Sequence, residues 1–142
     1  MRVKFVKDHE LAVLPSYVTE GAAGADVRSV KEYKIPPGGH TLVDTGLKCV
    51  IPEGYEVQVR PRSGLALKNR VTVLNSPGTV DSDYTGKLGV ILMNHSDEIF
   101  IVNPGDRIAQ IVVAPVVQAK FDWADEVKDS ERGNGGFGST GV

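Results

Sequence analysis

Residues 41–60 read TLVDTGLKCVIPEGYEVQVR and decide the fold class of this chain. The first half is rich in apolar residues, and the Pro-Glu-Gly at 52–54 then marks a turn. After the turn Tyr55, Val57 and Val59 alternate with polar residues, which is the pattern of a half-buried β-strand. The stretch therefore predicts two strands joined by a tight connection.

The same combination of short apolar stretches and turn residues continues through most of the chain. Proline and glycine pairs at 36–39, 77–78 and 104–105 separate the stretches. The expected strands are 3–6, 41–51, 55–60, 71–74, 88–93, 99–102 and 108–117, and the one short helix expected is 65–69. Many short strands with this spacing indicate an all-β sandwich or barrel.

The composition is that of an ordinary globular domain. The chain has 142 residues, with 41% hydrophobic and 24% charged residues, and no apolar run long enough to span a membrane. The N-terminus lacks an apolar signal core, so we expect a cytoplasmic protein without a membrane partner. The net charge of −2 and the absence of a long basic run argue against a nucleic-acid partner. The single cysteine, Cys49, is expected to be a packed core thiol.

The last residues differ in composition from the rest. We expect a β-barrel core over residues 1–121 and a C-terminal arm over residues 122–142. The arm ends in GNGGFGSTGV, which has too few apolar residues to fold by itself. It is either a flexible tail or a mobile arm that becomes ordered over a ligand.

Three internal segments carry candidate chemistry. Arg62-Ser63-Gly64 suits an anion site, although Ser63 as a plain helix cap is the simpler alternative. In the segment 75–86, which contains the Pro77-Gly78 turn signal, Asp81 and Asp83 can supply a general base or bind a metal through water. A polar loop with turn-forming aspartates explains that segment equally well.

Two further features point to a ligand. Gln110 is a polar residue inside an apolar run and therefore needs a hydrogen-bond partner, whereas Asp106 and Arg107 before it are interpreted as structural. In the arm, Phe137 lies between glycines and can stack on a base, with Ser139 and Thr140 donating to phosphate oxygens. This combination fits a nucleotide, but the spacing does not say which one.

Five segments together resemble the trimeric dUTPase family, which hydrolyses dUTP to dUMP and pyrophosphate. They occur in the family order at residues 23–27, 62–66, 75–86, 105–110 and 132–141, and the resemblance covers the chain from about residue 22 to its end. One position departs from the family pattern. Ala25 stands where a bulkier residue such as Tyr or Leu is more usual, so we expect a packing difference on the metal side of the site.

The resemblance implies a fold and a reaction. The fold would be a jelly-roll-like (β-clip) barrel with a mobile glycine-rich C-terminal arm, assembled as a homotrimer with shared active sites. The reaction would be magnesium-assisted attack of water on the α-phosphate of dUTP. Its cellular purpose would be to limit uracil incorporation into DNA and to supply dUMP for thymidylate synthesis.

The resemblance also assigns roles to single residues. Asp81 would be the catalytic base, and Asp26 would support Mg²⁺ through water. Tyr84 would pack on the deoxyribose, Gln110 would come from a second subunit, and the segment 75–86 would form a hairpin that receives uracil. The full substrate-binding set implied is Arg62, Ser63, Gly64, Asn75, Tyr84, Gln110, Arg132, Phe137, Gly138, Ser139 and Thr140.

Two other functions compete with this interpretation. A deaminase of the same fold acting on dCTP would need a glutamate in the segment 75–86, which has none. A dUTP-binding regulatory protein that changes shape would not need a catalytic carboxylate, so the presence of Asp81 speaks against a purely regulatory role. Regulation in addition to catalysis stays open.

Overall fold

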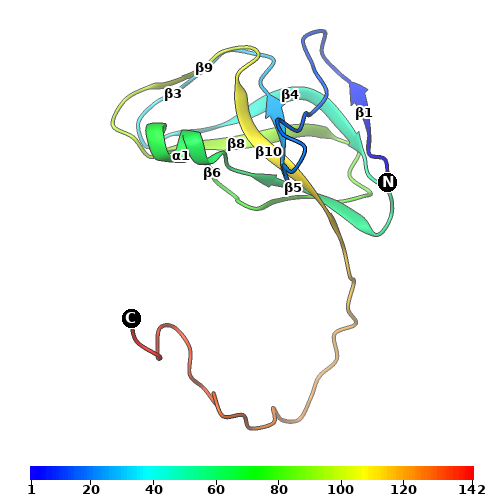
Figure 1. Cartoon of the computed structure of the whole chain (residues 1–142), viewed down its shortest axis with the longest axis vertical. Helices are drawn as coiled ribbons and strands as arrows, with labels where there is room; N and C mark the ends of the chain where they lie inside the picture. The colour runs from blue at the N-terminus through cyan, green and yellow to red at the C-terminus, as the bar shows by residue number, and fades with distance from the viewer.

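The computed structural model describes all residues 1–142, and its regular secondary structure is almost entirely β-strand (Figure 1). In chain order the elements are β1 (Lys4–Lys7), β2 (Ala25–Arg28), β3 (Tyr33–Ile35), β4 (His40–Val50), β5 (Tyr55–Arg60), α1 (Ser63–Asn69), β6 (Val71–Val73), β7 (Gly78–Val80), β8 (Lys87–Asn94), β9 (Phe100–Val102) and β10 (Arg107–Pro115). No helix of the structure is long and apolar enough to cross a membrane.

The strands form two four-stranded antiparallel sheets and one short pair. The first sheet has the order β1-β4-β8-β6 and the second has the order β2-β10-β5-β7, while β3 pairs with β9. Strands that follow one another in sequence mostly enter different sheets, which is typical of a jelly roll. The expected all-β, jelly-roll-like architecture is therefore confirmed.

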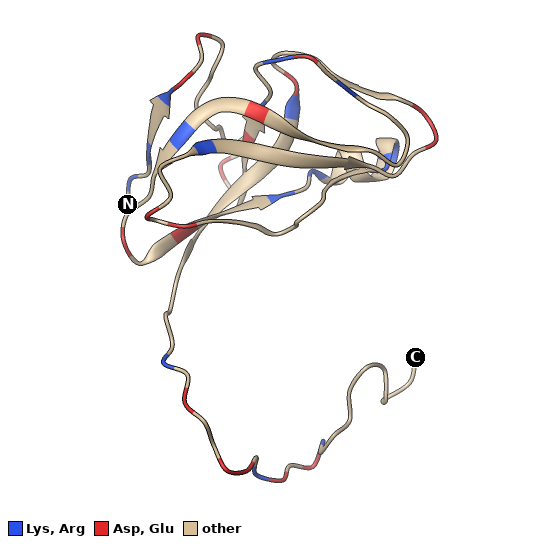
Figure 2. Cartoon of the chain, turned by 180° about the vertical axis from the view of Figure 1, so that it is seen from behind, with Lys and Arg blue, Asp and Glu red and all other residues tan.

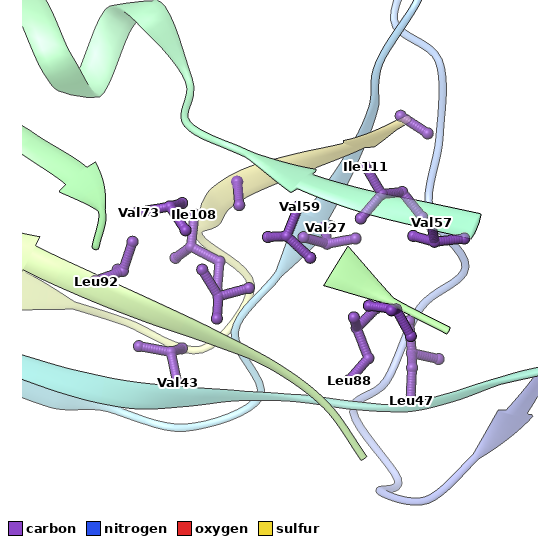
Figure 3. Close-up of a cluster of buried hydrophobic side chains, with 14 of the residues drawn as sticks. Val27, Val43, Leu47, Val57, Val59, Val73, Leu88, Leu92, Ile108 and Ile111 are labelled. Carbon is purple, nitrogen blue, oxygen red and sulfur yellow. The ribbon is translucent and has the colours of Figure 1, made fainter. Parts of the chain in front are cut away.

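The core lies between the two sheets, where their inward-facing side chains meet (Figure 3). Strand β8 shows why, because its side chains alternate regularly between buried and partly exposed along the whole strand. On β5, Val57 and Val59 are buried and the residue between them is partly exposed, as the alternation in the sequence predicts. Cys49 is also buried, and burial raises the pKa of its thiol to about 11.

This packing makes a test of the core straightforward. Leu92 on β8 is 1% exposed, whereas Leu67 on α1 is 85% exposed. We expect Leu92→Ala to lower the free energy of unfolding by about 2–5 kcal/mol, because it leaves a cavity between the sheets. Leu67→Ala deletes the same side-chain atoms, but at a position exposed to water. It should change the free energy of unfolding by less than about 0.5 kcal/mol. Urea unfolding of both variants compares the two, and equal losses would contradict this assignment of the core.

Two expectations of the sequence need correction. The Pro77-Gly78 pair does not form the turn of a β-hairpin, because the strands on either side of it lie in different sheets. Strand β6 pairs with β8 in one sheet, and β7 pairs with β5 in the other. Ala25 points away from Asp26, since adjacent residues of β2 face opposite sides of the sheet. It borders an apolar hollow beside Phe5 on the N-terminal strand. The packing difference at Ala25 is therefore on the side away from Asp26.

The chain leaves the body after β10. The N–H of Val116 donates to the carbonyl of Gly54 at 2.9 Å, and no later residue forms a hydrogen bond or ion pair with the body. Residues beyond Val116 contain no strand or helix, and Figure 1 shows them extending away from the sheets.

Candidate functional site

A pocket of about 370 Å³ opens beside the end of β7 and will be called the Asp81 pocket. Three residues that the sequence predicts for the site, Asn75, Asp81 and Tyr84, all line it. The segment between β7 and β8 supplies Asp81 and Tyr84, whereas Asn75 comes from the loop between β6 and β7. Asp81 is exposed, and its side chain forms no hydrogen bond or ion pair within the chain. Its carboxylate is therefore free to accept hydrogen bonds from water in the pocket.

Tyr84 is fixed by the backbone around it. Its hydroxyl donates to the carbonyl of Lys87 at 3.0 Å, and its N–H donates to the carbonyl of Asp81 at 3.2 Å. Gly86 lies beneath the ring, where an added Cβ would come within 2.3 Å of the Tyr84 hydroxyl oxygen. A side chain at position 86 would therefore displace the Tyr84 ring from this side of the pocket.

Two further charged residues of the pocket were not predicted from the sequence. Asp44 on β4 and Lys87 on β8 line the wall, and Lys87 also pairs with Asp8 at 3.1 Å. The hydrogen bond and the charge of Asp8 raise the pKa of Lys87, and the same hydrogen bond lowers the pKa of Asp8. Lys87 is therefore held at the edge of the Asp81 pocket between two carboxylates, those of Asp8 and Asp44. The pairing of β4 with β8 brings these residues together, and no local sequence pattern predicts that pairing.

A second group of polar residues will be called the Asp26 cluster and consists of Asp26, Arg62, Arg107 and Gln110. Asp26 Oδ2 accepts a hydrogen bond from Arg107 Nη1 at 3.1 Å, and its Oδ1 lies 3.5 Å from Arg62 Nε. Gln110 faces Asp26 across the β2–β10 ladder and donates through Nε2 to the carbonyl of Pro61 at 2.9 Å. The hydrogen-bond partner that Gln110 needs is thus a backbone carbonyl.

Gly24 provides the space for Gln110. A Cβ at position 24 would meet the Gln110 amide oxygen at 2.0 Å, so only glycine allows this amide to lie against the chain before β2. The amide keeps one N–H that Pro61 does not take.

Helix α1 begins beside the Asp26 cluster. Ser63 is its first helical residue, and the N-cap is Arg62, which makes no capping hydrogen bond through its side chain. The simpler alternative, Ser63 as a helix cap, is therefore wrong. Ser63 and Gly64 are both exposed in the first turn, where backbone N–H groups lack partners inside the helix.

The Asp81 pocket and the Asp26 cluster lie at opposite ends of β5. In the β5–β7 ladder Val80 lies opposite Val57, so Asp81 emerges beside the start of β5. Arg62 instead follows the end of that strand. The five residue-to-residue steps from position 56 to position 61 span about 16 Å of extended chain. Within a single copy of the chain, residues that the resemblance assigns to one substrate therefore lie far apart.

The remaining predicted residues, Arg132, Phe137, Gly138, Ser139 and Thr140, lie in the arm, away from both groups (Figure 1). The arm folds only into local turns, such as the one in which Arg132 Nε donates to the carbonyl of Gly135 at 2.7 Å. Phe137 is fully exposed. Figure 2 shows that acidic residues outnumber basic ones along the arm, whereas both signs are interspersed over the body.

No group of three or more His, Cys, Asp or Glu side chains is placed to hold a metal ion. Asp26 has an arginine beside each of its oxygens, but a carboxylate offers about four lone-pair sites and can still accept from water. Mg²⁺ prefers oxygen ligands, keeps several waters and is commonly bound through substrate phosphates. The residues present fit that mode of binding, with Asp26 as an outer contact.

Comparisons with known proteins find a matching family and similar sequences. A family model described as dUTPase matches residues 10–141. A relative from Nautilia profundicola is 53% identical over 141 residues, covering 99% of each chain. One from Chlamydia pneumoniae is 59% identical over 132 residues, covering 91% of each. Both relatives are named deoxyuridine 5'-triphosphate nucleotidohydrolase.

Solved structures match the fold over the whole chain. A variant of the Staphylococcus bacteriophage 80alpha dUTPase with dUpNHpp superposes with a TM-score of 0.91 at 25% identity, covering 99% of both chains. A variant of the dUTPase from phage phi11 of S. aureus, described with a structural Mg(II) ion, gives a TM-score of 0.80 at 23% identity. It covers 89% of this chain and 98% of its own.

The fold thus defines a jelly-roll-like protein that carries two polar groups, the Asp81 pocket and the Asp26 cluster. The chain belongs to the dUTPase family.

Proposed function

We propose that this protein hydrolyses dUTP to dUMP and pyrophosphate. The observation that carries the proposal is the Asp81 pocket, in which Asn75, Asp81 and Tyr84 lie together at the end of β7. The relatives that share half or more of its residues are named for this activity. Asp81, free of partners in the pocket, would orient a water and take its proton during attack on the α-phosphorus.

The other residues would bind and position the substrate. Asn75 would contact the uracil edge, and the Tyr84 ring, held flat over Gly86, would pack on the deoxyribose and exclude a 2′-hydroxyl. Arg62, Ser63, Gly64 and Gln110 would hold the phosphate chain. The arm would close over the base with Phe137, while Arg132, Gly138, Ser139 and Thr140 contact the phosphates.

We also propose Mg²⁺ as the cofactor, held chiefly by phosphate oxygens and water with Asp26 as an outer contact. When bound, the ion would offset phosphate charge that repels the attacking water. The chain itself would supply the arginines and backbone N–H groups that keep the phosphates in line with Asp81.

A complete site needs more than one copy of the chain. The three phosphates of dUTP are joined through shared oxygens, and the water on Asp81 attacks the first of them. The groups that hold the phosphate chain must therefore lie close to that water. Within one copy β5 separates these groups by about 16 Å. We therefore propose a homotrimer in which one subunit supplies the Asp81 pocket, a second supplies the Asp26 cluster, and the arm reaches a neighbouring site.

The substrate range tests the proposed activity. We expect magnesium-dependent pyrophosphate release from dUTP and at least about 10⁴-fold slower release from dCTP, because its ring edge would mispair with buried polar groups. UTP should be rejected by the Tyr84 ring and dTTP by its 5-methyl group. Release from all four nucleotides at similar rates would contradict a dUTP-specific pocket, and no release from any would contradict the enzyme activity.

Such an activity would act on the deoxynucleotide pool. It would limit uracil incorporation into DNA and supply dUMP for thymidylate synthesis, and we propose the cytoplasm as its location.

A further inference from the structure

We propose that Asp26 is a positioning residue whose main task is to hold Arg62 and Arg107 toward the phosphate chain. This inference rests on the proposed function, because it takes a nucleoside triphosphate as the ligand. It also gives Arg107, so far interpreted as structural, a place in phosphate binding.

Three contacts form a closed ring around Asp26. Oδ2 accepts from Arg107 Nη1 at 3.1 Å, and Oδ1 lies 3.5 Å from Arg62 Nε. Arg62 Nη1 completes the ring by donating to the backbone carbonyl of Arg107 at 3.0 Å. Each arginine is therefore held through the carboxylate, and Arg62 also fixes the backbone from which Arg107 projects.

Burial decides which arginine faces outward. The side chain of Asp26 is 10% exposed, that of Arg62 is 25% exposed and that of Arg107 is 40% exposed. Arg62 uses two of its nitrogens within the ring, whereas Arg107 uses one. The remaining N–H groups of Arg107 are therefore available to an anion.

The charge of the ring suits a phosphate better than a cation. Two guanidinium groups share one carboxylate, which leaves a net positive charge, and no other acidic side chain pairs with either arginine. Arginine forks match phosphate oxygens in a bidentate manner when their orientation is fixed. A metal-bound water can still reach Asp26, but an arginine nitrogen already lies beside each of its oxygens.

A second arginine on the strand of Asp26 offers a control. Arg28, two residues beyond Asp26 on β2, donates through Nη1 to the carbonyl of Gly105 at 2.7 Å. It forms no hydrogen bond or ion pair with Asp26, Arg62 or Arg107. It is therefore a matched control: an arginine on the same face of the same strand, outside the ring.

The test is binding of dUpNHpp by calorimetry in EDTA, with dUMP as the ligand that lacks the outer phosphates. We expect Asp26→Asn and Arg107→Gln each to weaken dUpNHpp binding at least about tenfold and to leave dUMP binding unchanged. The double variant should be no weaker than the worse single one, because both changes break the same ring. Arg28→Gln should bind both ligands like the parent protein.

A second measurement separates this role from support of the metal's water shell. If Asp26→Asn keeps its affinity for dUpNHpp in EDTA but needs more Mg²⁺ for half-maximal rate, the positioning role is overturned. If the Asn variant does not fold by circular dichroism, Arg107→Gln carries the test alone, and unchanged affinity there overturns the proposal. A parent protein that neither binds dUpNHpp nor hydrolyses dUTP would instead reject the proposed function.

Discussion

Replacing Asp81 with asparagine is expected to lower the turnover of dUTP by about 10²–10⁴-fold, the usual contribution of a general base. Asparagine has the same shape but cannot take a proton from water. The Asp81 side chain is exposed and has no partner in the chain, so Tm should stay the same. The affinity for dUpNHpp should change no more than a few-fold. Steady-state rates, calorimetric binding and thermal unfolding of the same preparation measure the three quantities.

Asp83 supplies the control for this experiment. It lies two residues further along the same segment, is equally exposed and makes no ion pair, but borders the hollow on the other side of Asp81 and not the Asp81 pocket. Asp83→Asn should therefore keep nearly full activity. Equal losses in both variants would mean that a general change in charge, and not a specific base, controls the rate.

The strands were predictable where an apolar run or an alternating pattern marks them in the sequence. All seven expected strands are present with ends within two residues, and β5 matches at both ends, because alternating Val57 and Val59 leave one possible face for the core. The strands β2, β3 and β7 were not predicted. Each has only three or four residues and is held by its neighbours in the sheets, which no local pattern reveals.

The candidate site was predictable in its chemistry and less so in its arrangement. Asn75, Asp81 and Tyr84 are close in sequence and therefore had to be near one another. Asp26 and Arg107 are 81 residues apart, and only the β2–β10 ladder joins them. The sequence also gave no sign that β5 separates Asp81 from Arg62, since that depends on which strands pair.

Removing residues 132–142 is expected to abolish most turnover and leave stability unchanged. The arm contributes no hydrogen bond to the body, and Phe137 is fully exposed, so Tm should stay within about a degree or two. Stacking of a base on an aromatic ring contributes roughly 1–3 kcal/mol. Phe137→Ala alone should therefore cost about 5- to 150-fold in kcat/KM.

Trp123→Ala is the matched control for Phe137→Ala, because Trp123 is an equally exposed aromatic of the arm outside the glycine-rich end. The Trp123→Ala variant should keep the kcat/KM of the parent protein if the effect of Phe137→Ala depends on the residue that covers the base. A truncated chain that unfolds, or one that keeps full turnover, would contradict the role of the arm as a lid.

Mixing two inactive proteins then tests whether the arm serves another subunit. The Asp81→Asn chain has an intact arm, and the truncated chain has an intact Asp81 pocket. Because the arm leaves the body after Val116 without returning to its own pocket, we expect co-refolded mixtures to regain activity while each protein alone stays inactive (Figure 1). Mixed trimers would contain sites in which the base of one chain meets the arm of another. A mixture that stays inactive, although sedimentation shows mixed trimers, would mean that the arm closes on its own chain.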